Sequence, residues 1–522
     1  MTTLNFDPMA GIPAIADAIR KLAPGARLTS DSRRMQPGDV FFAFAEGRAF
    51  IDSALANGAV LVVFDPDGGA LPDSPGLSPT VARIGVARLK QFAGPIAHAY
   101  YDRPDSAMFT VGVTGTNGKT SSAVWLGQAL ARGGELAAVV GTLGVGVFRA
   151  RGEVEYDVTG YTTPDAVLLA RTLAGLREQG AQSLAIEVSS IGLDQHRVDG
   201  MHFDVAVFTN LTRDHLDYHG DMAAYEAAKV KLFDWPGLKT AVVNLDDPAG
   251  LRLIAHLQSQ PALAGTIPLI GYTLQDAASC PDMAGVLVLR ASQLRSGRAG
   301  GTEFHLDCPL GAALVKTRLV GAFNISNALG VMGALLAKGT GLRAAIEAVE
   351  ALEPAPGRMQ QVGGQDAPLI VIDYAHTPDA LEKTLAALRA VAADRNGQLW
   401  CVFGCGGDRD PGKRPQMGRI AQAADQVIVT SDNPRSEDPH AIIEQIVAGM
   451  DLHHPASRVQ TQDDRAGAIL SAIKQAGKAD VILLAGKGHE PYQEIKGKKL
   501  PFSDTDHAQL ALSARLTMMR PH

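Results

Sequence analysis

A glycine-rich stretch, VGVTGTNGKTSS at residues 111–122, lies between an apolar strand-like run and an apolar helical pattern. Gly115 and Gly118 allow the backbone to approach a polyphosphate, and successive N–H groups at a helix start point at such an anion. Lys119 would reach the terminal phosphates, and the hydroxyl of Thr120 would ligate Mg²⁺. The stretch therefore predicts a nucleotide-binding loop. The alternative is a glycine-rich turn with a solvated lysine, which the flanking strand and helix patterns disfavour.

Residues that suit a divalent cation follow two other apolar runs. Glu187 ends the run SLAIE, and the stretch TNLTRDHLDYHGD follows the run VAVF. That stretch supplies the candidate residues Asp214, His215, Asp217 and His219. A glutamate, a histidine and phosphate oxygens together suit a hard divalent cation. A histidine at a strand end is usually structural, but this one is expected one strand away from the glycine-rich loop, so we expect catalytic or metal-binding use.

Two lysines, Lys229 and Lys231, lie in the helical pattern MAAYEAAKVKLFDW at residues 222–235. Lysine is seldom fully buried. Judged from these residues alone, the preferred interpretation is an exposed basic face of a helix.

The composition favours a globular protein of several domains over a disordered or nucleic-acid-binding one. The chain has 522 residues, of which 46% are apolar and 20% charged, and this favours two to four globular domains. A net charge of −7 gives no electrostatic reason to expect nucleic acid as the main ligand. The N-terminus lacks a signal-peptide pattern, and no run of about 18 apolar residues occurs. We therefore expect a cytoplasmic protein without membrane insertion.

The cysteines are too few for a disulfide scaffold. There are four of them: Cys280, Cys308, Cys401 and Cys405. The last two form a C-x3-C pair with no second Cys/His pair nearby, so zinc is not expected. We expect this pair to be small buried hydrophobic residues near a strand end.

Apolar runs alternate with helical patterns along most of the chain, which predicts α/β domains with mostly parallel sheets. Breaks in this rhythm predict three domains, residues 1–105, 106–348 and 349–522. Residues 265–320 interrupt the rhythm with shorter strand-like runs. In open α/β sheets, ligands bind outside the carboxyl ends of the strands, so the polar residues after each apolar run are the site candidates.

A series of motifs occurs in order along the chain. They are GTNGKT, EVSS, TNLTRDHLDYHG, YEAAKVKLF, FNISNALG, PGRMQ, DYAHTPDAL, GCGGDRDPGKRP, SDNPRSEDP and GKGHEPYQ. Together they resemble the Mur ligase family of peptidoglycan synthesis, and the resemblance spans nearly the whole chain. Within that family the chain is similar to the members that add the third residue of the peptide stem.

The resemblance implies a small N-terminal α/β domain that binds the uridine-linked precursor, a central P-loop-type ATP-binding domain with a parallel sheet, and a C-terminal Rossmann-like domain. It also implies an ATP- and Mg²⁺-dependent amide ligation, in which a carboxylate becomes an acyl phosphate that an amine attacks. The implied small-molecule substrates are UDP-N-acetylmuramoyl-L-alanyl-D-glutamate and meso-diaminopimelate, and the implied state is a monomer. Catalysis would then be mainly positioning and charge stabilisation.

The resemblance also implies roles for residues on the ATP side. The phosphates would be held by Thr114, Gly115, Thr116, Asn117, Gly118, Lys119 and Thr120. The Mg²⁺ ions would be arranged by Thr120, Glu187 and His215. Lys229 matches the family lysine that is carbamylated, which would make it an anionic metal ligand and replace the exposed-face interpretation. The remaining nucleotide contacts would be Asn324, Arg358, Asp373 and His376.

The other two substrates also have matching residues. Contacts to the precursor would come from Ser32, Thr162, Thr163, Ser189, Gln195 and Arg197. In SDNPRSEDP, Arg435 can clamp a diaminopimelate carboxylate bidentately, and Asp432 and Asn433 can bind its far charged groups. Pro434 would stiffen this turn. The rest of the amino-acid pocket would be Arg409, Gly486 and Glu490.

The chain departs from the family pattern in two places. A short EGRAFIDSAL replaces a longer stretch that carries D-G-H, so the uridine contacts, including any role for Gly47 or Arg48, are left open. Tyr161 stands where members often have Asn. The rival interpretations are a lysine-adding homologue, a folylpolyglutamate-synthetase-like amide ligase, and a nucleotide-gated scaffold or transport ATPase that hydrolyses ATP without ligation.

Overall fold

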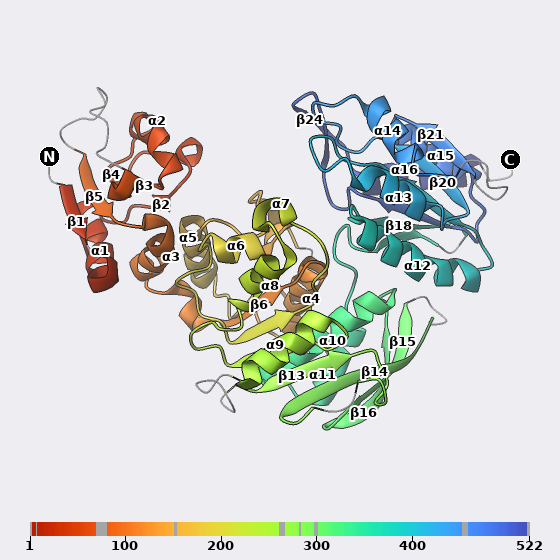
Figure 1. Ribbon diagram of the computed structural model, residues 1–522, viewed down its shortest axis with the longest axis horizontal. Coiled ribbons are helices and arrows are strands. Elements are labelled where there is room, and N and C mark those ends of the chain that lie inside the picture. Colours follow the sequence, from red (N-terminus) through yellow and green to blue (C-terminus); the bar gives the residue numbers. More distant parts are fainter. Residues whose placement is uncertain are drawn as a thin grey trace. The chain divides into compact units, whose positions relative to one another are not determined.

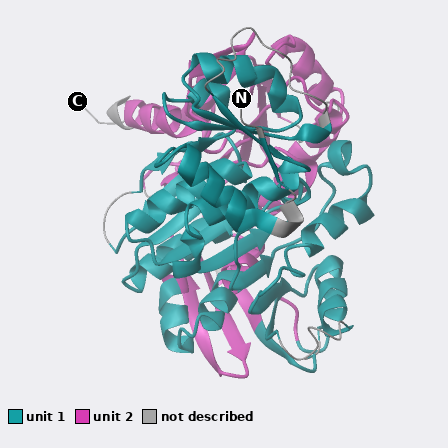
Figure 2. Cartoon of the chain, turned by 90° about the vertical axis from the view of Figure 1, so that its left-hand side faces the viewer, with its two compact units in different colours: residues 1–273, 277–289, 330–348 teal, residues 274–276, 290–329, 349–522 magenta. Residues whose placement is uncertain are grey.

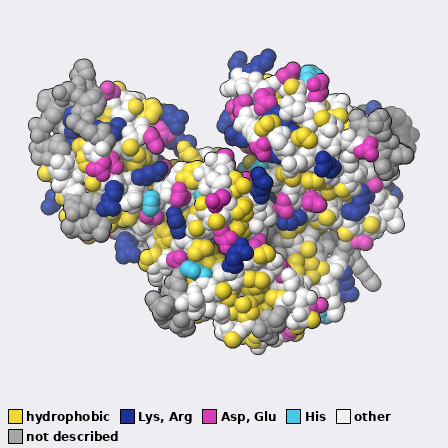
Figure 3. Space-filling view, viewed as in Figure 1, with side chains coloured by type: hydrophobic (Ala, Val, Ile, Leu, Met, Phe, Trp, Pro, Cys, Tyr) yellow, Lys and Arg dark blue, Asp and Glu magenta, His cyan; other side chains and the backbone are white. Residues whose placement is uncertain are grey.

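The structure is a computed structural model with two compact units. It describes residues 3–6, 8–68, 81–150, 154–259, 267–280, 283–296, 301–364, 366–451 and 458–518. The first unit comprises residues 1–273, 277–289 and 330–348, and the second comprises residues 274–276, 290–329 and 349–522 (Figure 2). On the face seen in Figure 3, basic side chains lie interspersed with acidic ones.

The first unit begins with a five-stranded parallel sheet, as the N-terminal sequence pattern predicts (Figure 1). Its strand order is β1 (Thr3–Phe6), β5 (Ala82–Val86), β4 (Leu61–Phe64), β3 (Val40–Ala43) and β2 (Leu28–Thr29). The helices of this part are α1 (Pro8–Leu22), α2 (Ile51–Ala56) and α3 (Leu89–Tyr100). β3 and β4 are buried throughout because helices cover a parallel sheet on both faces.

The larger sheet of the first unit is the one that positions the glycine-rich loop. Its parallel strands lie in the order β13 (Leu269–Thr273), β12 (Thr240–Asn244), β11 (Val205–Phe208), β6 (Phe109–Thr114), β10 (Ser183–Glu187) and β7 (Ala137–Gly141). Two antiparallel strands follow β7, namely β8 (Gly144–Phe148) and β9 (Tyr156–Asp157). The accompanying helices are α4 (Lys119–Arg132), α5 (Ala166–Glu178), α6 (Ser190–Asp194), α7 (Leu216–His219), α8 (Met222–Val230) and α9 (Pro248–Ser259). The strand-helix alternation predicted from the apolar runs is confirmed.

One predicted helix is too long. The pattern at residues 222–235 continues to Trp235, but α8 ends at Val230 and the chain forms turns from Lys231 onward. Pro236 disfavours helical backbone at the residue before it. Trp235 instead donates its indole N–H to the carbonyl oxygen of Met201 at 3.0 Å.

The second unit contains a six-stranded sheet. Its order is β17 (Gln360–Gly363), β18 (Leu369–Asp373), β22 (Val481–Ala485), β19 (Leu399–Phe403), β20 (Gln426–Thr430) and β21 (Val459–Gln462), with only β17 antiparallel to its neighbour. Its helices are α12 (Pro378–Asp394), α13 (Lys413–Ala421), α14 (Pro439–Val447), α15 (Arg465–Gln475) and α16 (Asp504–Met518). A separate hairpin is formed by β23 (Tyr492–Ile495) and β24 (Lys498–Pro501).

The irregular region 265–320 contains longer strands than predicted. The strands β14 (Val286–Ser296), β15 (Thr302–Cys308) and β16 (Gly311–Thr317) pair antiparallel, and β14 has 11 residues. Burial alternates along β15, so its polar residues on the exposed face broke up the apolar pattern. The helices predicted after this region are present as α10 (Ala322–Ala337) and α11 (Leu342–Glu350). Across the described residues, every helix is too short or too polar to cross a lipid bilayer.

A network of histidines and aspartates lies at the amino ends of the larger sheet of the first unit. Asp105 accepts a hydrogen bond from the backbone N–H of His202 at 2.6 Å, and its carboxylate also contacts Nδ1 of His202 at 2.8 Å and Nδ1 of His98 at 3.1 Å. Nε2 of His202 lies 3.4 Å from Asp204 Oδ2. The two carboxylates raise the pKa of His202 to about 9, against the opposing effect of burial. His202 is therefore a cation that ties the loop before β6 to the start of β11.

His202→Asn keeps a neutral donor but removes this charge. A histidine whose folded-state pKa is raised stabilises the fold fully below its unfolded pKa near 6.5, and this stabilisation disappears as pH rises through about 9. We expect the variant to lose about 2 kcal/mol of unfolding free energy at pH 5.5 and almost none at pH 9.8. Urea denaturation of both proteins at both pH values measures this. Equal losses at the two pH values would contradict the charge argument.

Candidate functional site

The glycine-rich loop connects the end of β6 to the start of α4, as the sequence predicts. Gly115 has φ +150° and Gly118 has φ +89°. A Cβ atom on Gly115 would lie 1.9 Å from Thr209 Oγ1, so only glycine fits at this position. Lys119 is the first residue of α4 and Thr120 the second, which places both at the helix N-terminus where anions are favoured.

The stretch after β11 holds the loop in place. Asn210 Oδ1 accepts a hydrogen bond from the Asn117 N–H at 2.9 Å, and the Thr209 hydroxyl donates to the Asn117 carbonyl oxygen at 2.6 Å. The hydroxyl of Thr116 donates to the carbonyl oxygen of Thr212 at 3.1 Å. Sequence analysis did not assign Thr209, Asn210 or Thr212, although they belong to the quoted TNLTRDH motif. Their polar side chains directly after a buried strand were the available signal.

Two lysines contact one carbonyl oxygen of the loop. Lys119 Nζ lies 2.8 Å from the oxygen of Gly115, and Lys229 Nζ lies 2.9 Å from the same atom. Lys229 is only 2% exposed, so the interpretation of an exposed basic face is wrong for this residue. Its Nζ lies 4.4 Å from the ring centre of Tyr225. The side chain of Lys229 therefore points from α8 into the protein interior. Lys231, in contrast, is half exposed and pairs with Asp194 at 3.1 Å.

The buried position changes the acidity of Lys229. Burial lowers its pKa well below the usual value, and the positive charge of Lys119 lowers it further. The amine is therefore more easily neutral, and hence nucleophilic, than that of a solvated lysine.

Glu187 lies beside the loop at the end of the neighbouring strand β10. Its Oε2 accepts a hydrogen bond from the hydroxyl of Thr120 at 3.0 Å. Its Oε1 accepts from the backbone N–H of Thr142 at 2.7 Å, and the Thr142 hydroxyl lies 3.2 Å from Oε2. Thr142 is a residue that sequence analysis missed, because it follows β7 and is adjacent only through the strand order. A Cβ on Gly141 would collide with Glu187 Oε1 at 2.1 Å.

His215 directly precedes the short helix α7 and has φ +53°. Its side chain is 44% exposed, and Nε2 lies 3.6 Å from Asp214 Oδ2. Partial burial lowers its pKa, and Lys119 and Lys229 act in the same direction, so a neutral imidazole is favoured. Its ring lies 6.0 Å from that of Tyr225. The phenol oxygen of Tyr225 in turn lies 3.1 Å from the Thr116 hydroxyl, so this ring connects His215, Lys229 and the loop.

The other polar residues near His215 are less central. His219 Nε2 lies 3.0 Å from the Ser190 hydroxyl, and Asp217 is exposed. A metal ion at Glu187 would need ligands from outside these side chains, because within the described ranges no three His, Cys, Asp or Glu residues form a metal-binding group. The hard oxygen donors of Glu187 and Thr120 suit Mg²⁺ with phosphate oxygens completing its coordination.

Five of the six residues matched to the precursor form one cluster around the ends of β9 and β10. Thr163 donates to the Glu187 carbonyl oxygen at 2.8 Å and to the Ser189 hydroxyl at 3.1 Å. Arg197 donates to the carbonyl oxygen of Thr163 at 2.9 Å and to Gln195 Oε1 at 2.7 Å. These contacts put Thr163, Ser189, Gln195 and Arg197 together.

Thr162 and Tyr161 also contact this cluster. Thr162 Oγ1 lies 3.1 Å from Thr142 Oγ1, which links the cluster to Glu187. The ring of Tyr161 lies under the Arg197 guanidinium at 5.6 Å and is 47% exposed. Ser32 lies elsewhere, in the N-terminal sheet region, where it is buried and its carbonyl oxygen accepts from Asn57. Arg48 Nη1 lies 3.5 Å from the carbonyl oxygen of Asp65.

The residues matched to nucleotide contacts in the second unit lie on α10, at the end of β18, and in the loops before β17 and after β18. Asn324 is buried in α10, where its amide donates to the carbonyl oxygen of Val320 at 2.8 Å. Asp373 ends β18 and accepts two backbone N–H groups, and burial raises its pKa. The Arg358 guanidinium lies 4.5 Å from the ring centre of Tyr374, and Nδ1 of the exposed His376 lies 2.8 Å from the Tyr374 carbonyl oxygen. Arg358 and His376 thus flank one tyrosine.

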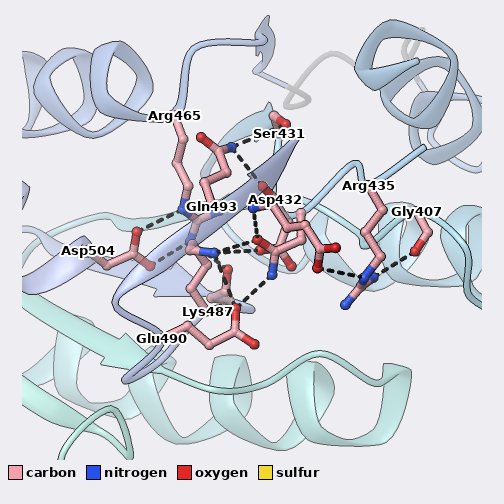
Figure 4. Close-up of polar contacts among 12 residues, drawn as sticks. Gly407, Ser431, Asp432, Arg435, Arg465, Lys487, Glu490, Gln493 and Asp504 are labelled. Carbon is pink, nitrogen blue, oxygen red and sulfur yellow. Dashed lines mark hydrogen bonds and ion pairs between the residues drawn. The ribbon is translucent and has the colours of Figure 1, made fainter. Parts of the chain in front are cut away.

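The residues matched to the amino-acid pocket lie in the second unit, in the loops after β19, β20 and β22. Arg435 has φ +51° and donates to the carbonyl oxygen of Gly407 at 2.7 Å (Figure 4). Its Nε lies 3.5 Å from Glu494 Oε2. Arg409 is exposed, and its side chain donates to the neighbouring Asp408 carbonyl oxygen. Pro434 is buried and precedes the left-handed Arg435, as expected for a stiff turn.

Asp432, Asn433 and Glu490 meet around a buried lysine, Lys487, that sequence analysis did not assign (Figure 4). Asn433 Nδ2 donates to Glu490 Oε2 at 2.7 Å. Gly486 has φ +108° and its N–H donates to the Asp373 carbonyl oxygen at 3.1 Å. The cysteine pair of the GCGG stretch is buried as predicted, and burial raises the pKa of both Cys401 and Cys405 to about 12.

Two side-chain contacts brace these loops and were also missed. The Arg414 guanidinium is 1% exposed and binds both oxygens of Glu437 at 2.8 Å. Asp408 accepts a hydrogen bond from the Ser436 hydroxyl at 2.5 Å. These contacts tie the loop after β19 to the loop after β20.

Gly115→Ala tests the close packing of the glycine-rich loop. The added methyl group would collide with Thr209, so we expect nucleotide affinity to fall at least ~10-fold and the unfolding midpoint to fall as after overpacking. Gly134→Ala is a matched control, because Gly134 follows the other end of α4 with φ +93° and has nothing within 4 Å of its Cβ direction. It should lose about 1 kcal/mol of stability from the positive φ alone and keep its nucleotide affinity. Equal nucleotide binding by both variants would contradict the argument.

Comparisons with known proteins agree with this geometry. The chain matches the family model of the Mur ligase middle domain over residues 113–335 and that of the Mur ligase, glutamate ligase domain over residues 357–488. A UDP-N-acetylmuramoyl-L-alanyl-D-glutamate--2,6-diaminopimelate ligase of Janthinobacterium sp. (strain Marseille) is 58% identical over 509 residues, 97% of each chain. A protein of the same name from Ralstonia nicotianae is 50% identical over 97% of each chain.

Solved structures show the same fold. One ligase structure with that name is 36% identical, covers 94% of this chain and 95% of its own, and has a TM-score of 0.63. A MurF ligase from Thermotoga maritima in complex with ADP has a TM-score of 0.63 at 18% identity, over 95% of this chain and 99% of its own. The α/β class predicted from the sequence is thus confirmed. By its family-model matches and its 58% identity to a full-length relative, the chain belongs to the Mur ligase family.

Proposed function

We propose that the chain is an ATP-dependent ligase that adds meso-diaminopimelate to the D-glutamyl carboxylate of UDP-N-acetylmuramoyl-L-alanyl-D-glutamate during peptidoglycan biosynthesis. The reaction releases ADP and phosphate and yields a tripeptide-bearing nucleotide. The observation that carries the proposal is the 58% identity, over 97% of both chains, to a relative named for this ligation. The phosphate loop, Glu187 and the two lysines at Gly115 supply the chemistry that the reaction needs.

The chain's residues act by holding and orienting charged groups. A carboxylate is a poor electrophile and an oxide is a poor leaving group, and phosphorylation of the precursor carboxylate corrects both faults. Lys119 and the N–H groups at the start of α4 would bind the transferred phosphoryl group, and Thr120, Glu187 and His215 would hold Mg²⁺. Bound Mg²⁺ supplies charge stabilisation for phosphoryl transfer. The neutral imidazole favoured at His215 suits a metal ligand.

Lys229 has the environment that carbamylation requires. Its lowered pKa favours the neutral amine, whose nitrogen attacks the carbon of CO₂. The N–C bond forms as one C=O π bond opens onto oxygen, and the nitrogen releases a proton to water. The product is a carbamate anion, which the neighbouring Lys119 charge stabilises. We propose that carbamylated Lys229 is an anionic ligand beside Glu187 rather than a buried cation.

The remaining substrate contacts are assigned by position. The precursor is held by Ser32 and by the Thr162, Thr163, Ser189, Gln195 and Arg197 cluster, and the nucleotide by Thr114 to Thr120, Asn324, Arg358, Asp373 and His376. Residues 1–105, 106–348 and 349–522 serve as the precursor-binding, ATP-binding and amino-acid-binding domains. The protein acts as a monomer in the cytoplasm, where ATP and nucleotide-linked precursors are available.

The amine substrate is assigned to the loops after β19, β20 and β22. Diaminopimelate carries two carboxylates and two amines, and Arg435 offers a planar bidentate donor set that a lysine side chain does not. Asp432, Asn433 and Glu490 offer oxygen acceptors for an ammonium group, with Arg409 and Gly486 at the same loops.

One assay tests the proposed function. Purified protein receives ATP, Mg²⁺ and the UDP-muramoyl-dipeptide, with diaminopimelate, lysine or glutamate offered in turn, while phosphate release and product mass are measured. We expect phosphate release that depends on the precursor, and a tripeptide product with diaminopimelate. Lys229→Met should reduce product formation by roughly 100-fold or more, because the anionic metal ligand is lost. ATP hydrolysis that is equal without precursor, and that yields no tripeptide, would overturn the proposal.

Arg435→Ala should raise the KM for diaminopimelate by roughly 100-fold while leaving the KM for ATP within about 3-fold, because the variant loses a carboxylate clamp and no phosphate contact. Arg435→Lys should recover only a small part of this loss, since an ammonium cannot bind a carboxylate in the planar bidentate geometry. Steady-state kinetics with each substrate varied separately give both constants. An unchanged KM and kcat for diaminopimelate in Arg435→Ala would refute the clamp.

A further inference from the structure

Lys487 lies among the proposed amine-binding residues, but nothing above gives it a role. Its side chain is 0% exposed. Its Nζ lies 3.4 Å from Asp432 Oδ1, 3.1 Å from Asn433 Oδ1 and 3.2 Å from Glu490 Oε2 (Figure 4). An ammonium group has three donors and no acceptor, so these three oxygens use all of its hydrogen bonds. A lysine buried to this extent is retained where it is fully paired.

Aromatic rings hold the ammonium of Lys487 from other sides. The centres of the Tyr492 and Phe502 rings lie 5.9 Å and 6.0 Å from Nζ, at the outer limit of a cation–π contact. Gln493, next to Tyr492, donates to the Asp432 carbonyl oxygen at 2.7 Å. The β23–β24 hairpin therefore closes the side of the pocket that Lys487 occupies.

The charges around this lysine decide what the pocket can accept. Arg465 and Asp504 form a fully buried pair at 2.6 Å and compensate each other. Arg435 lies 3.5 Å from Glu494. Two carboxylates remain, Asp432 and Glu490, and Lys487 is the cation that contacts both. At Asp432 and Glu490, the one positive charge of Lys487 against two negative charges leaves a single net negative charge for a ligand to neutralise.

We infer that Lys487 is a specificity-determining positioning residue that sets the charge of the amine pocket, an inference that rests on the proposed function. The far end of diaminopimelate carries one ammonium and one carboxylate. The single net negative charge at Asp432 and Glu490 receives the ammonium, and Arg435 receives the carboxylate. Without Lys487 the pocket holds two uncompensated carboxylates, which repel the far carboxylate and favour a far end with an ammonium alone, as in lysine.

Lys487→Met removes the charge and keeps the length of the side chain. We expect the KM for diaminopimelate to rise roughly 30-fold, the KM for ATP to stay within about 3-fold, and the ratio of kcat/KM for diaminopimelate over lysine to fall roughly 100-fold. The measurement is the same ligation assay with each amine varied separately. If Lys487→Met does not fold, Lys487→Gln keeps a donor, removes the charge and should shift the ratio in the same direction.

The double variant Lys487→Met, Glu490→Gln separates charge balance from a merely structural role. Removing one carboxylate restores the single net negative charge, so the ratio should rise again relative to Lys487→Met alone. Further loss of discrimination in the double variant would overturn the inference. Lys499→Met is the matched control: this exposed lysine contacts the same Tyr492 ring at 4.2 Å from outside the pocket, and the variant should keep the wild-type ratio.

The two proposals fail in different ways. Wild-type protein that ligates no amine to the precursor would refute the proposed function. Wild-type protein that ligates diaminopimelate, together with a Lys487→Met variant whose amine ratio is unchanged, would refute only the role of Lys487.

Discussion

The carbonyl oxygen of Gly115 organises the phosphate loop, because two lysine ammonium groups converge on it. This is possible only with glycine at residue 115, where a side chain would collide with Thr209. One of the two lysines, Lys229, is buried in the protein, and the proximity of Lys119 makes its protonated form still less favourable. Burial and a neighbouring positive charge thus favour the neutral form of a side chain that reaches the loop from more than a hundred positions away in the sequence. The adjacent Glu187 carboxylate is held by Thr120 and Thr142 in an equally restricted way.

The sequence predicted the elements around this site better than the contacts between them. The glycine-rich loop, the run ending in Glu187 and the strand before His215 lie where the apolar runs placed them, because a buried strand followed by a polar turn is a local pattern. Thr142 and Asn210 were missed because their partners depend on which strands are neighbours, and strand order is not visible in local periodicity. For a related reason, the sequence of its own helix predicted an exposed Lys229, whereas the residue is buried. The helical pattern shows which residues of α8 share a face, but it does not show which face the rest of the protein covers.

In the second unit, too, the sequence identified residues of the proposed amine-binding loops but not the contacts between them. The motif SDNPRSEDP drew attention to Arg435 and its neighbours, but the structure shows that these residues are braced by Arg414 on Glu437 and by Asp408 on Ser436. The motif also left Lys487 unassigned, since a lysine between two glycines has the composition of a solvated turn. In the structure, Lys487 is completely buried and its ammonium group contacts three oxygen acceptors. Burial is a property of the assembled sheet and could not be derived from the order of residues.

The hydrogen bond from Gly486 to the carbonyl oxygen of Asp373 joins two adjacent strands, β18 and β22, at their carboxyl ends. β18 carries a residue proposed for the nucleotide, whereas the loops after β19, β20 and β22 carry those proposed for the amine. The Gly486 contact is a main-chain contact, so this attachment does not depend on which side chains the loop after β22 carries. Under the proposed function, a change of the incoming amino acid would therefore be made by side chains on three loops, while the strand proposed to contact the nucleotide keeps its attachment at the sheet edge.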